Sequence, residues 1–165
     1  MTDGPTAQLQ PAQSHRPIVL AQVMLPADAN ATGDVHGGTL MKLADTAGGI
    51  AAMRHARRRV VTAVADSMTF EYPVKVGDLV LLEAEVTWVG RTSIEVEIAI
   101  AAEDIVTGQR KRTSLAYFVY VALGEDGHPT EVPSLVLLTD AERTRFARAE
   151  ERRRFRLAQR SQHRL

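Results

Sequence analysis

The chain has 165 residues, of which 45% are hydrophobic and 24% are charged, and its 20 Lys and Arg residues balance 20 Asp and Glu residues. This length and composition predict one globular domain with a core of ordinary size. Because the sequence contains no cysteine, disulfides, thiolate metal sites and a cysteine nucleophile are excluded.

The charge is unevenly placed along the chain. Residues 1–138 hold 11 Lys and Arg against 16 Asp and Glu, whereas residues 139–165 hold 9 Arg against 4 acids. A basic tail of this kind suits nucleic acid, an acidic neighbouring subunit or a phosphorylated ligand. Since the body carries no net positive charge and aromatic residues are few, we expect no nucleic-acid partner.

The first 17 residues are polar and lack the apolar stretch of a signal peptide. No apolar run approaches the roughly 18 residues that a membrane-spanning helix needs. We therefore expect a disordered lead-in over residues 1–17 and a cytoplasmic protein without a membrane partner.

The first predicted elements are a strand and a helix. An apolar run at residues 18–25 predicts a short buried strand, which Pro26 ends. A loop rich in Gly, Asn, Asp and Thr follows at residues 27–38. From residue 39 to about residue 55, apolar side chains recur at spacings of three and four, which predicts a helix. Small and apolar residues fill most of its other positions, and a helix that is apolar on all sides is buried.

Four segments with a period of two follow, at residues 60–70, 79–89, 93–101 and 109–123. In the second segment the alternation places on one face Val80, Leu82, Ala84, Val86 and Trp88. Long alternating strands with short connections favour an antiparallel sheet. One helix with one large sheet predicts an α+β protein in which the sheet curls round the helix, the architecture called the hotdog fold. The open edges of such a sheet favour pairing with a second copy.

Residues 139–165 predict a separate arginine-rich helix. Thr139 suits its N-cap, and the acids at 140 and 142 suit its first turn. Its strongly apolar residues are few, so we expect it to lie on the surface or to cross to another subunit. The chain thus divides into the lead-in 1–17, a domain over 18–138 and the basic helix 139–165.

The most informative residues are two acids around the start of the first helix. Asp45 lies within the apolar helix, where an ionised carboxylate costs several kcal/mol unless it is paired, hydrated or used. Asp34 lies in the preceding loop, where it could also be a plain turn residue. The backbone N–H groups of Gly37 and Gly38 lie at the helix start, where negative charge is favoured. Donors for a developing oxyanion beside an acid that directs water predict acyl-transfer chemistry.

Two other polar residues in the loop have weaker claims to a chemical role. His36 adjoins the two glycines, and we expect it to position the loop rather than to transfer protons. Asn30 is expected to stabilise the loop. No third ligand is properly placed beside His36 and the acids, so we expect no metal site.

Four segments resemble the acyl-CoA thioesterases of the hotdog superfamily, more narrowly the group of YciA-like enzymes and the brain-type cytosolic acyl-CoA hydrolase. They are DANATGDVHGGTLMKLADTAGGIAA at 28–52, VVTAVADSMTFEYPVKVGD at 60–78, VGRTSIEVEI at 89–98 and SLAYFVYVAL at 114–123. The resemblance covers roughly residues 18–138, and its segments occur in the same order as in the family.

The resemblance implies hydrolysis of an acyl-CoA to a free acid and coenzyme A, in a site between two subunits. The position matching Asp45 acts as general base or nucleophile, and the position matching Asp34 helps to orient water or the carbonyl. The amides matching Gly37 and Gly38 bind the thioester oxygen, with His36 beside them. No metal or redox cofactor is implied. The implied assembly is at least a dimer and, more fully, a trimer of dimers.

Coenzyme A contacts are expected at three places. The resemblance implies that Asp66 and Ser67 line the site. The turn formed by Gly90, Arg91, Thr92 and Ser93 combines an arginine and two hydroxyls with backbone N–H groups, which suits a phosphate. Arg58 and Arg59 could reach the phosphates of coenzyme A, although a run of arginines is more often a solvated surface.

Two other functions are compatible with these residues. A hotdog dehydratase or hydratase would pair a histidine with an acid, here His36 with Asp45. A non-catalytic acyl-CoA sensor would bind the same ligand without turnover.

Overall fold

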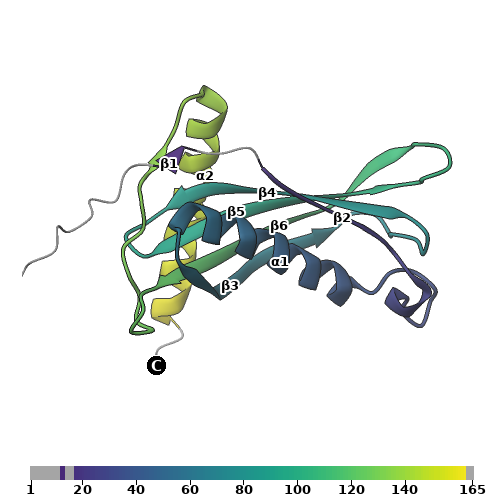
Figure 1. The fold of residues 1–165 in the computed structure, drawn as a ribbon, viewed down its shortest axis with the longest axis horizontal. Coiled ribbons are helices and arrows are strands. Elements are labelled where there is room, and N and C mark those ends of the chain that lie inside the picture. The colour runs from purple at the N-terminus through teal and green to yellow at the C-terminus, as the bar shows by residue number, and fades with distance from the viewer. Residues whose placement is uncertain (1–11, 14–16, 163–165) are drawn as a thin grey trace, which may run out of the picture.

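The computed structural model describes residues 12–13 and 17–162. One antiparallel sheet wraps round the long helix α1 (Figure 1). The sheet has five strands in the order β2-β4-β5-β6-β3, with bounds β2 Ile18–Val23, β3 Arg59–Phe70, β4 Leu79–Val89, β5 Ser93–Glu103 and β6 Arg110–Leu123. The helices are the short 3-10 turn η1 Pro26–Asp28, α1 Gly37–Ala56 and α2 Asp140–Gln162. The predicted hotdog architecture is confirmed.

Helix α1 has identifiable start and stop signals. His36 is its N-cap, and Arg57 ends it in the left-handed conformation with a φ of 53°. Arg54 and His55 in the last turn suit the negative end of the helix dipole. One side of the helix is buried against the sheet, through Leu40, Leu43, Ala44, Ala47, Gly48, Ala51, Ala52, His55 and Ala56.

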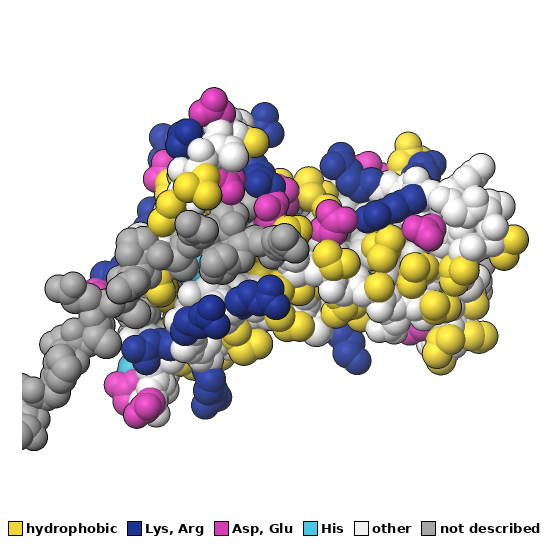
Figure 2. Space-filling model, turned by 45° about the horizontal axis from the view of Figure 1, so that its top comes forward, with side chains coloured by type: hydrophobic (Ala, Val, Ile, Leu, Met, Phe, Trp, Pro, Cys, Tyr) yellow, Lys and Arg dark blue, Asp and Glu magenta, His cyan; other side chains and the backbone are white. Residues whose placement is uncertain are grey.

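The other side of α1 corrects the expectation of burial on all sides. Met41, Ile50 and Met53 are 41%, 37% and 43% exposed in the single chain. Exposed Lys42 and Thr46 lie on the same side, so this side is mixed, and its three exposed apolar side chains favour a surface for another protein chain. Figure 2 shows hydrophobic side chains gathered over the end of the molecule where α1 begins.

The core lies between α1 and the concave face of the sheet. On β5 the predicted alternation is confirmed, since the buried inward residues are Ile94, Val96, Ile98 and Ile100. From β4 and β6 come Val80, Leu82, Phe118 and Tyr120. Burying each such side chain contributes about 1.5–3 kcal/mol, which makes this layer the main source of stability.

Strand β2 differs from the predicted buried strand at residues 18–25. It is an edge strand that pairs only with β4, and Val19 and Val23 are 61% and 41% exposed. Only Ile18 and Met24 contribute buried side chains. An apolar run does not reveal which strand lies at a sheet edge, and an edge strand has a neighbour on one side only.

Trp88 also differs from the prediction that placed it on one face with Val86. The register of β4 against β5 shifts between Val86 and Trp88, so that Trp88 lies opposite Glu95. A bulge inserts one residue and reverses the faces that follow it. Trp88 therefore leaves the face of Val86 and lies on the convex side of the sheet, with the guanidinium of Arg153 above its ring.

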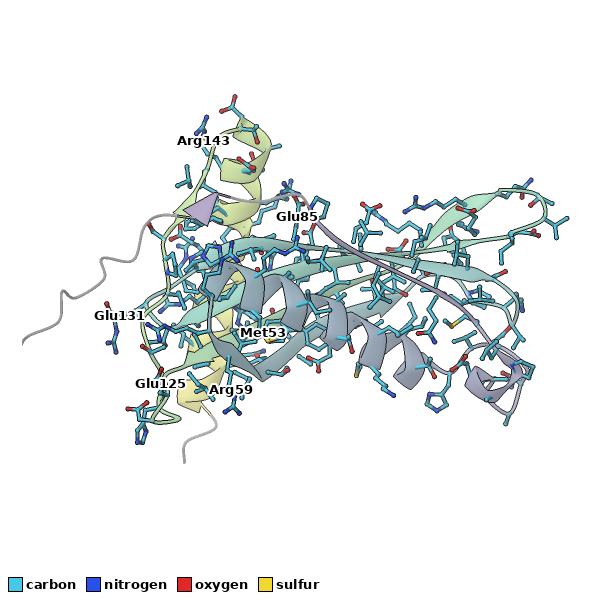
Figure 3. All side chains as sticks on the ribbon, viewed as in Figure 1. Met53, Arg59, Glu85, Glu125, Glu131 and Arg143 are labelled. Carbon is cyan, nitrogen blue, oxygen red and sulfur yellow. The ribbon has the colours of Figure 1, made fainter. Side chains whose placement is uncertain are left out.

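The basic helix α2 crosses this convex side, as predicted for a surface helix (Figure 1). Thr139 and Glu142 cap its start reciprocally. Arg145 pairs with Glu85 of β4, near the helix start labelled by Arg143 in Figure 3. Arg152 and Arg156 reach the fully buried Glu95 at 2.6 Å and 2.8 Å, and Arg156 also reaches Asp66 at 2.6 Å. The basic tail thus neutralises acids of the body within one chain.

The lead-in is described only in part. Ala12–Gln13 forms the short strand β1, which runs parallel to β7 at Leu135–Val136. The expectation of disorder is therefore wrong for these two residues. The remaining lead-in, residues 1–11 and 14–16, lies outside the described residues.

We expect Glu95→Ala to lower the free energy of unfolding by about 3 kcal/mol, because it leaves two poorly exposed guanidinium groups without their buried partner. Glu83→Ala is the matched control. Glu83 lies on β4 and forms a 3.0 Å ion pair with Arg110, and both side chains of this pair are exposed. Its loss should be below about 1 kcal/mol. Urea denaturation measures both values. Equal losses would show that α2 is not held by Glu95.

Candidate functional site

The structure places Asp45 where α1 faces β3 and β6. The Thr62 hydroxyl donates a hydrogen bond to Asp45 Oδ1 at 2.7 Å. The Tyr120 hydroxyl shares its single hydrogen between the Asp45 carbonyl at 3.0 Å and the same Oδ1 at 3.3 Å. Thr62 and Tyr120 are register partners on adjacent strands. Asp45 Oδ2 accepts no hydrogen bond from the described residues, so one carboxylate oxygen is fixed and the other is available.

Tyr120 reaches the helix because Gly48 has no side chain. A methyl group at Gly48 would overlap the Tyr120 hydroxyl, whereas one at Gly49 would meet the ring at an ordinary 3.7 Å. Burial raises the pKa of Tyr120, and the Asp45 carboxylate beside it raises that pKa further. The hydroxyl therefore remains a proton donor at neutral pH.

Asn30 organises the loop before α1. Its side-chain Oδ1 accepts hydrogen bonds from Thr32 N at 2.9 Å, from Thr32 Oγ1 at 2.7 Å and from Asp34 N at 3.2 Å. This is the expected loop-stabilising role. Its side-chain Nδ2 has no acceptor among the described residues, and Asn30 lines the same cavity as Gly37.

His36 and the two glycines form the start of the helix. The ring Nδ1 of His36 accepts the backbone N–H of Gly38 at 2.9 Å. The Gly38 N–H is therefore already hydrogen-bonded within the loop. Of the two predicted oxyanion donors, it differs in this respect from the Gly37 N–H. In the described part of the chain the Gly37 N–H has no acceptor, and it borders a cavity of about 280 Å³.

Asp34 has an ion-pair partner of its own. It forms a close ion pair with Lys75, and the two residues are also joined by an isolated β-bridge. Its side chain is 29% exposed. The cavity beside it is lined by Asn30, Asp34, Val35, Gly37, Leu40, Phe70, Glu71, Tyr72, Pro73 and Val74.

The Gly37 amide and the Asp45 carboxylate of one chain are far apart. Eight residues of α1 separate them, which at 1.5 Å per residue is about 12 Å along the helix. A donor for an oxyanion must lie about 3 Å from that oxygen. The separation along the helix is several times that contact distance.

The residues expected to contact coenzyme A fall into two groups. Asp66 is engaged by Arg156 of α2, with only 16% of its side chain exposed, and Ser67 beside it is exposed. Arg91 is 80% exposed in a turn closed by the Gly90 N–H to Ser93 carbonyl bond of 2.8 Å. Thr92 lies in the same turn, and its carbonyl accepts the N–H of Ala122.

Arg58 and Arg59 lie at the same end of the sheet as this turn. Strand β6 pairs Leu123 with Arg59 and Val121 with Ser93, so both chain segments end together. Figure 3 shows Arg59 at that end, where α1 has ended and where Glu131, the partner of Arg91, also lies. Figure 2 shows a row of Lys and Arg side chains in this region.

Thr62 and Tyr120 were not among the residues predicted for the site. Both lie on predicted strands with hydroxyl groups toward the helix, and Gly48 marks the point of close approach. The small residues of the helix were the available signal, but they do not identify which side chain fills the space.

We expect Gly48→Ala to destabilise the protein, because the new methyl group displaces the Tyr120 hydroxyl or shifts α1 from the sheet. The neighbouring Gly49→Ala is its matched control. It should stabilise by about 0.5–1 kcal/mol, since alanine favours the helix and finds room there. Thermal and urea unfolding would compare the two. A stabilised Gly48→Ala variant would contradict the close approach of Tyr120.

Among the described residues no helix is long and apolar enough to cross a membrane. In the same part of the chain, no group of three or more His, Asp or Glu residues is placed to hold a metal ion.

Solved structures with this fold include a Staphylococcus aureus acyl-CoA hydrolase in complex with butyryl coenzyme A and coenzyme A. It is 34% identical, with a TM-score of 0.82 over 88% of this chain and 89% of that one. A hexameric acyl-CoA thioesterase is 33% identical, with a TM-score of 0.87 over 92% and 97% of the two chains.

Alanine variants of the Staphylococcus aureus enzyme have been solved at an asparagine, an aspartate and a threonine. That asparagine precedes the aspartate by 15 residues, and the threonine follows it by 17. Asn30, Asp45 and Thr62 have the same two spacings in this chain.

Comparison with known sequences identifies the family. The family model described as the thioesterase superfamily matches residues 32–109. The acyl-CoA thioester hydrolase YkhA of Bacillus subtilis, itself uncharacterised, is 38% identical over 140 residues, which are 82% of this chain and 81% of YkhA. The cytosolic acyl coenzyme A thioester hydrolase of Rattus norvegicus is 36% identical over 77% of this chain, but the match spans only 34% of its length. The chain belongs to the thioesterase superfamily, in the group of the acyl-CoA thioester hydrolases.

Proposed function

We propose that this protein hydrolyses an acyl-CoA thioester to a free carboxylic acid and coenzyme A. The observation that carries the proposal is the arrangement at Asp45, where two hydroxyls hold Oδ1 and leave Oδ2 available. A carboxylate oriented in this way can take a proton from water in a reaction that needs a general base. The relatives named above, one of them bound to butyryl coenzyme A, support the choice of thioester.

The chemical step requires an acid, a donor and a water molecule. The Gly37 N–H polarises the thioester carbonyl and stabilises the oxyanion that forms on attack. Asp45 Oδ2 takes a proton from the attacking water, and the coenzyme A thiolate leaves and receives that proton. Direct attack of Asp45 on the carbonyl, followed by hydrolysis of the anhydride, gives the same products.

The site is shared between two subunits in this proposal. Because about 12 Å separate the amide from the carboxylate along α1, the Gly37 N–H comes from one subunit and Asp45 from its partner. The exposed Met41, Ile50 and Met53 on α1 and the exposed Val61 on the edge strand β3 supply an apolar surface for that pairing. The hexameric relatives support further assembly, which we propose to be a trimer of dimers.

The loop carries the supporting groups. Asn30, which has the spacing of the asparagine varied in the Staphylococcus aureus enzyme, directs its Nδ2 to the reacting carbonyl or water. Asp34 holds this loop through Lys75, and His36 holds it through the Gly38 N–H. In this assignment the two residues position Gly37 rather than contact the water.

The phosphates of coenzyme A bind at the arginine-rich end of the sheet. Arg58, Arg59 and Arg91 are exposed there, and the last of them adjoins the hydroxyls of Thr92 and Ser93. Ser67 remains an exposed contact on β3, whereas Asp66 acts by holding Arg156. No metal or redox cofactor is needed for this reaction. We place the reaction in the cytoplasm, as the name of the rat relative suggests.

We expect Asp45→Asn to lower kcat for acyl-CoA hydrolysis by at least about 100-fold, since the amide cannot accept the proton. Release of free thiol from short, long and aromatic acyl-CoAs measures the rate. Asp104→Asn is the control, because Asp104 caps the exposed turn between β5 and β6, and asparagine can make the same bonds.

An Asp45→Asn variant as active as the wild type would overturn the assignment of the base. Enoyl-CoA hydration by a wild-type protein that releases no thiol would instead favour the hydratase, which pairs His36 with Asp45. Tight acyl-CoA binding without either reaction would favour the sensor.

A further inference from the structure

Tyr120 is the one aromatic hydroxyl on β6 that faces α1, among the described residues. Its side chain is 1% exposed and its ring lies 6.4 Å from that of Phe118, in a stacked arrangement. The other tyrosine on this strand, Tyr117, points to the convex side, where its hydroxyl donates to Glu97 at 2.9 Å. The two tyrosines share a strand and differ in the acid that they contact.

The hydroxyl of Tyr120 makes two contacts with one residue of α1. Its single hydrogen is shared between the Asp45 carbonyl at 3.0 Å and Asp45 Oδ1 at 3.3 Å. The first contact fixes the helix backbone against β6 at this turn. The second lies on the carboxylate oxygen that also accepts from Thr62. The bonds from Tyr120 and Thr62 to Oδ1 limit rotation of the Asp45 carboxylate to the position that leaves Oδ2 available.

Thr62 restrains the same carboxylate oxygen from the edge strand β3, at 2.7 Å. Its side chain is exposed in the single chain. Tyr120 is buried, and a hydrogen bond to a charged group is stronger where water is excluded. Its position is fixed by the Phe118 ring on one side and by the space at Gly48 on the other. Tyr120 therefore restrains Asp45 from a position that is fixed within the single chain.

We propose that Tyr120 is a positioning residue for the hydrolysis of acyl-CoA, which orients the Asp45 carboxylate without contacting the substrate. The proposal rests on the proposed function of Asp45. It explains why the helix carries glycine at position 48, where alanine would favour the helix itself. The close approach of the Tyr120 hydroxyl requires that glycine.

The test compares Tyr120→Phe with Tyr117→Phe in the full-length oligomeric protein. Both remove one hydroxyl that bonds to an acid and keep the ring. We expect Tyr120→Phe to lower kcat by about tenfold or more with KM nearly unchanged, because substrate binding does not involve the hydroxyl. Tyr117→Phe should keep the wild-type kcat. The melting temperature and the oligomeric state establish that each variant is folded.

A double-variant cycle separates positioning from a general loss of packing. If Tyr120 acts through Asp45, adding Tyr120→Phe to Asp45→Asn leaves the residual rate unchanged. If it acts only on packing, the rate falls by the same factor in both backgrounds, and the proposal is overturned. A folded Tyr120→Phe variant with a wild-type kcat overturns it too. The single variant Asp45→Asn tests the proposed base by itself. If that variant keeps the wild-type rate, the proposed function fails, whatever the result for Tyr120→Phe.

Discussion

The rise of an α-helix sets the distance between the two groups that the proposed reaction uses. The Gly37 N–H lies at the first residue of α1 and Asp45 lies eight residues later, so about 12 Å of helix separates them. No side-chain rotation closes that gap, and the helix is buried along one side over its whole length. In the proposed reaction, two copies of the helix bring an amide and a carboxylate to one carbonyl group. The exposed apolar residues on α1 and β3 are consistent with that requirement.

The sheet determines how Asp45 is presented. Thr62 and Tyr120 lie opposite each other on β3 and β6, and both reach the same oxygen of the carboxylate. The convex side of the sheet binds helix α2. There the arginines of α2 pair with Glu85, Glu95 and Asp66, which anchors the C-terminal helix. The acidic body and the basic tail of the sequence are therefore partners within the chain, and the charge asymmetry needs no nucleic acid to explain it.

The period of the sequence was sufficient to predict the helix, the long strands and the wrapped sheet. It failed where the structure depends on local irregularity or on position in the sheet. The bulge before Trp88 moves this side chain to the convex face of the sheet, and the alternation of apolar residues in the sequence does not reveal it. Strand β2 is as apolar as a central strand, although it lies at an edge. The pairing of Asp66 with Arg156 joins residues 90 positions apart, which composition alone could not connect.

In the candidate site too, some residues could be predicted from the sequence and others could not. Asp45 and Gly37 could be predicted, because an acid in an apolar helix and glycines at its start are local features. Tyr120 could not, since it lies 75 positions from Asp45 and depends on the register of β6 against β3. Gly38 bonds to His36, and Asp34 pairs with Lys75. These contacts depend on the geometry of the loop, which could not be predicted from its residue types.

Mixing two inactive variants tests the shared site most directly. Gly37→Pro removes the N–H at a position where proline suits the helix, since this is the first helical residue and His36 before it is extended, with φ −64° and ψ 128°. A Cβ there meets the Phe70 ring at 3.4 Å, so the folded state of the variant is checked by its melting temperature. Co-expression of Gly37→Pro with Asp45→Asn gives mixed pairs in which one of the two sites is intact. The account predicts recovery to about a quarter of wild-type activity, as expected for random pairing in a two-fold dimer. A mixture as inactive as its parents would show that each subunit carries its own complete site, and would contradict the account.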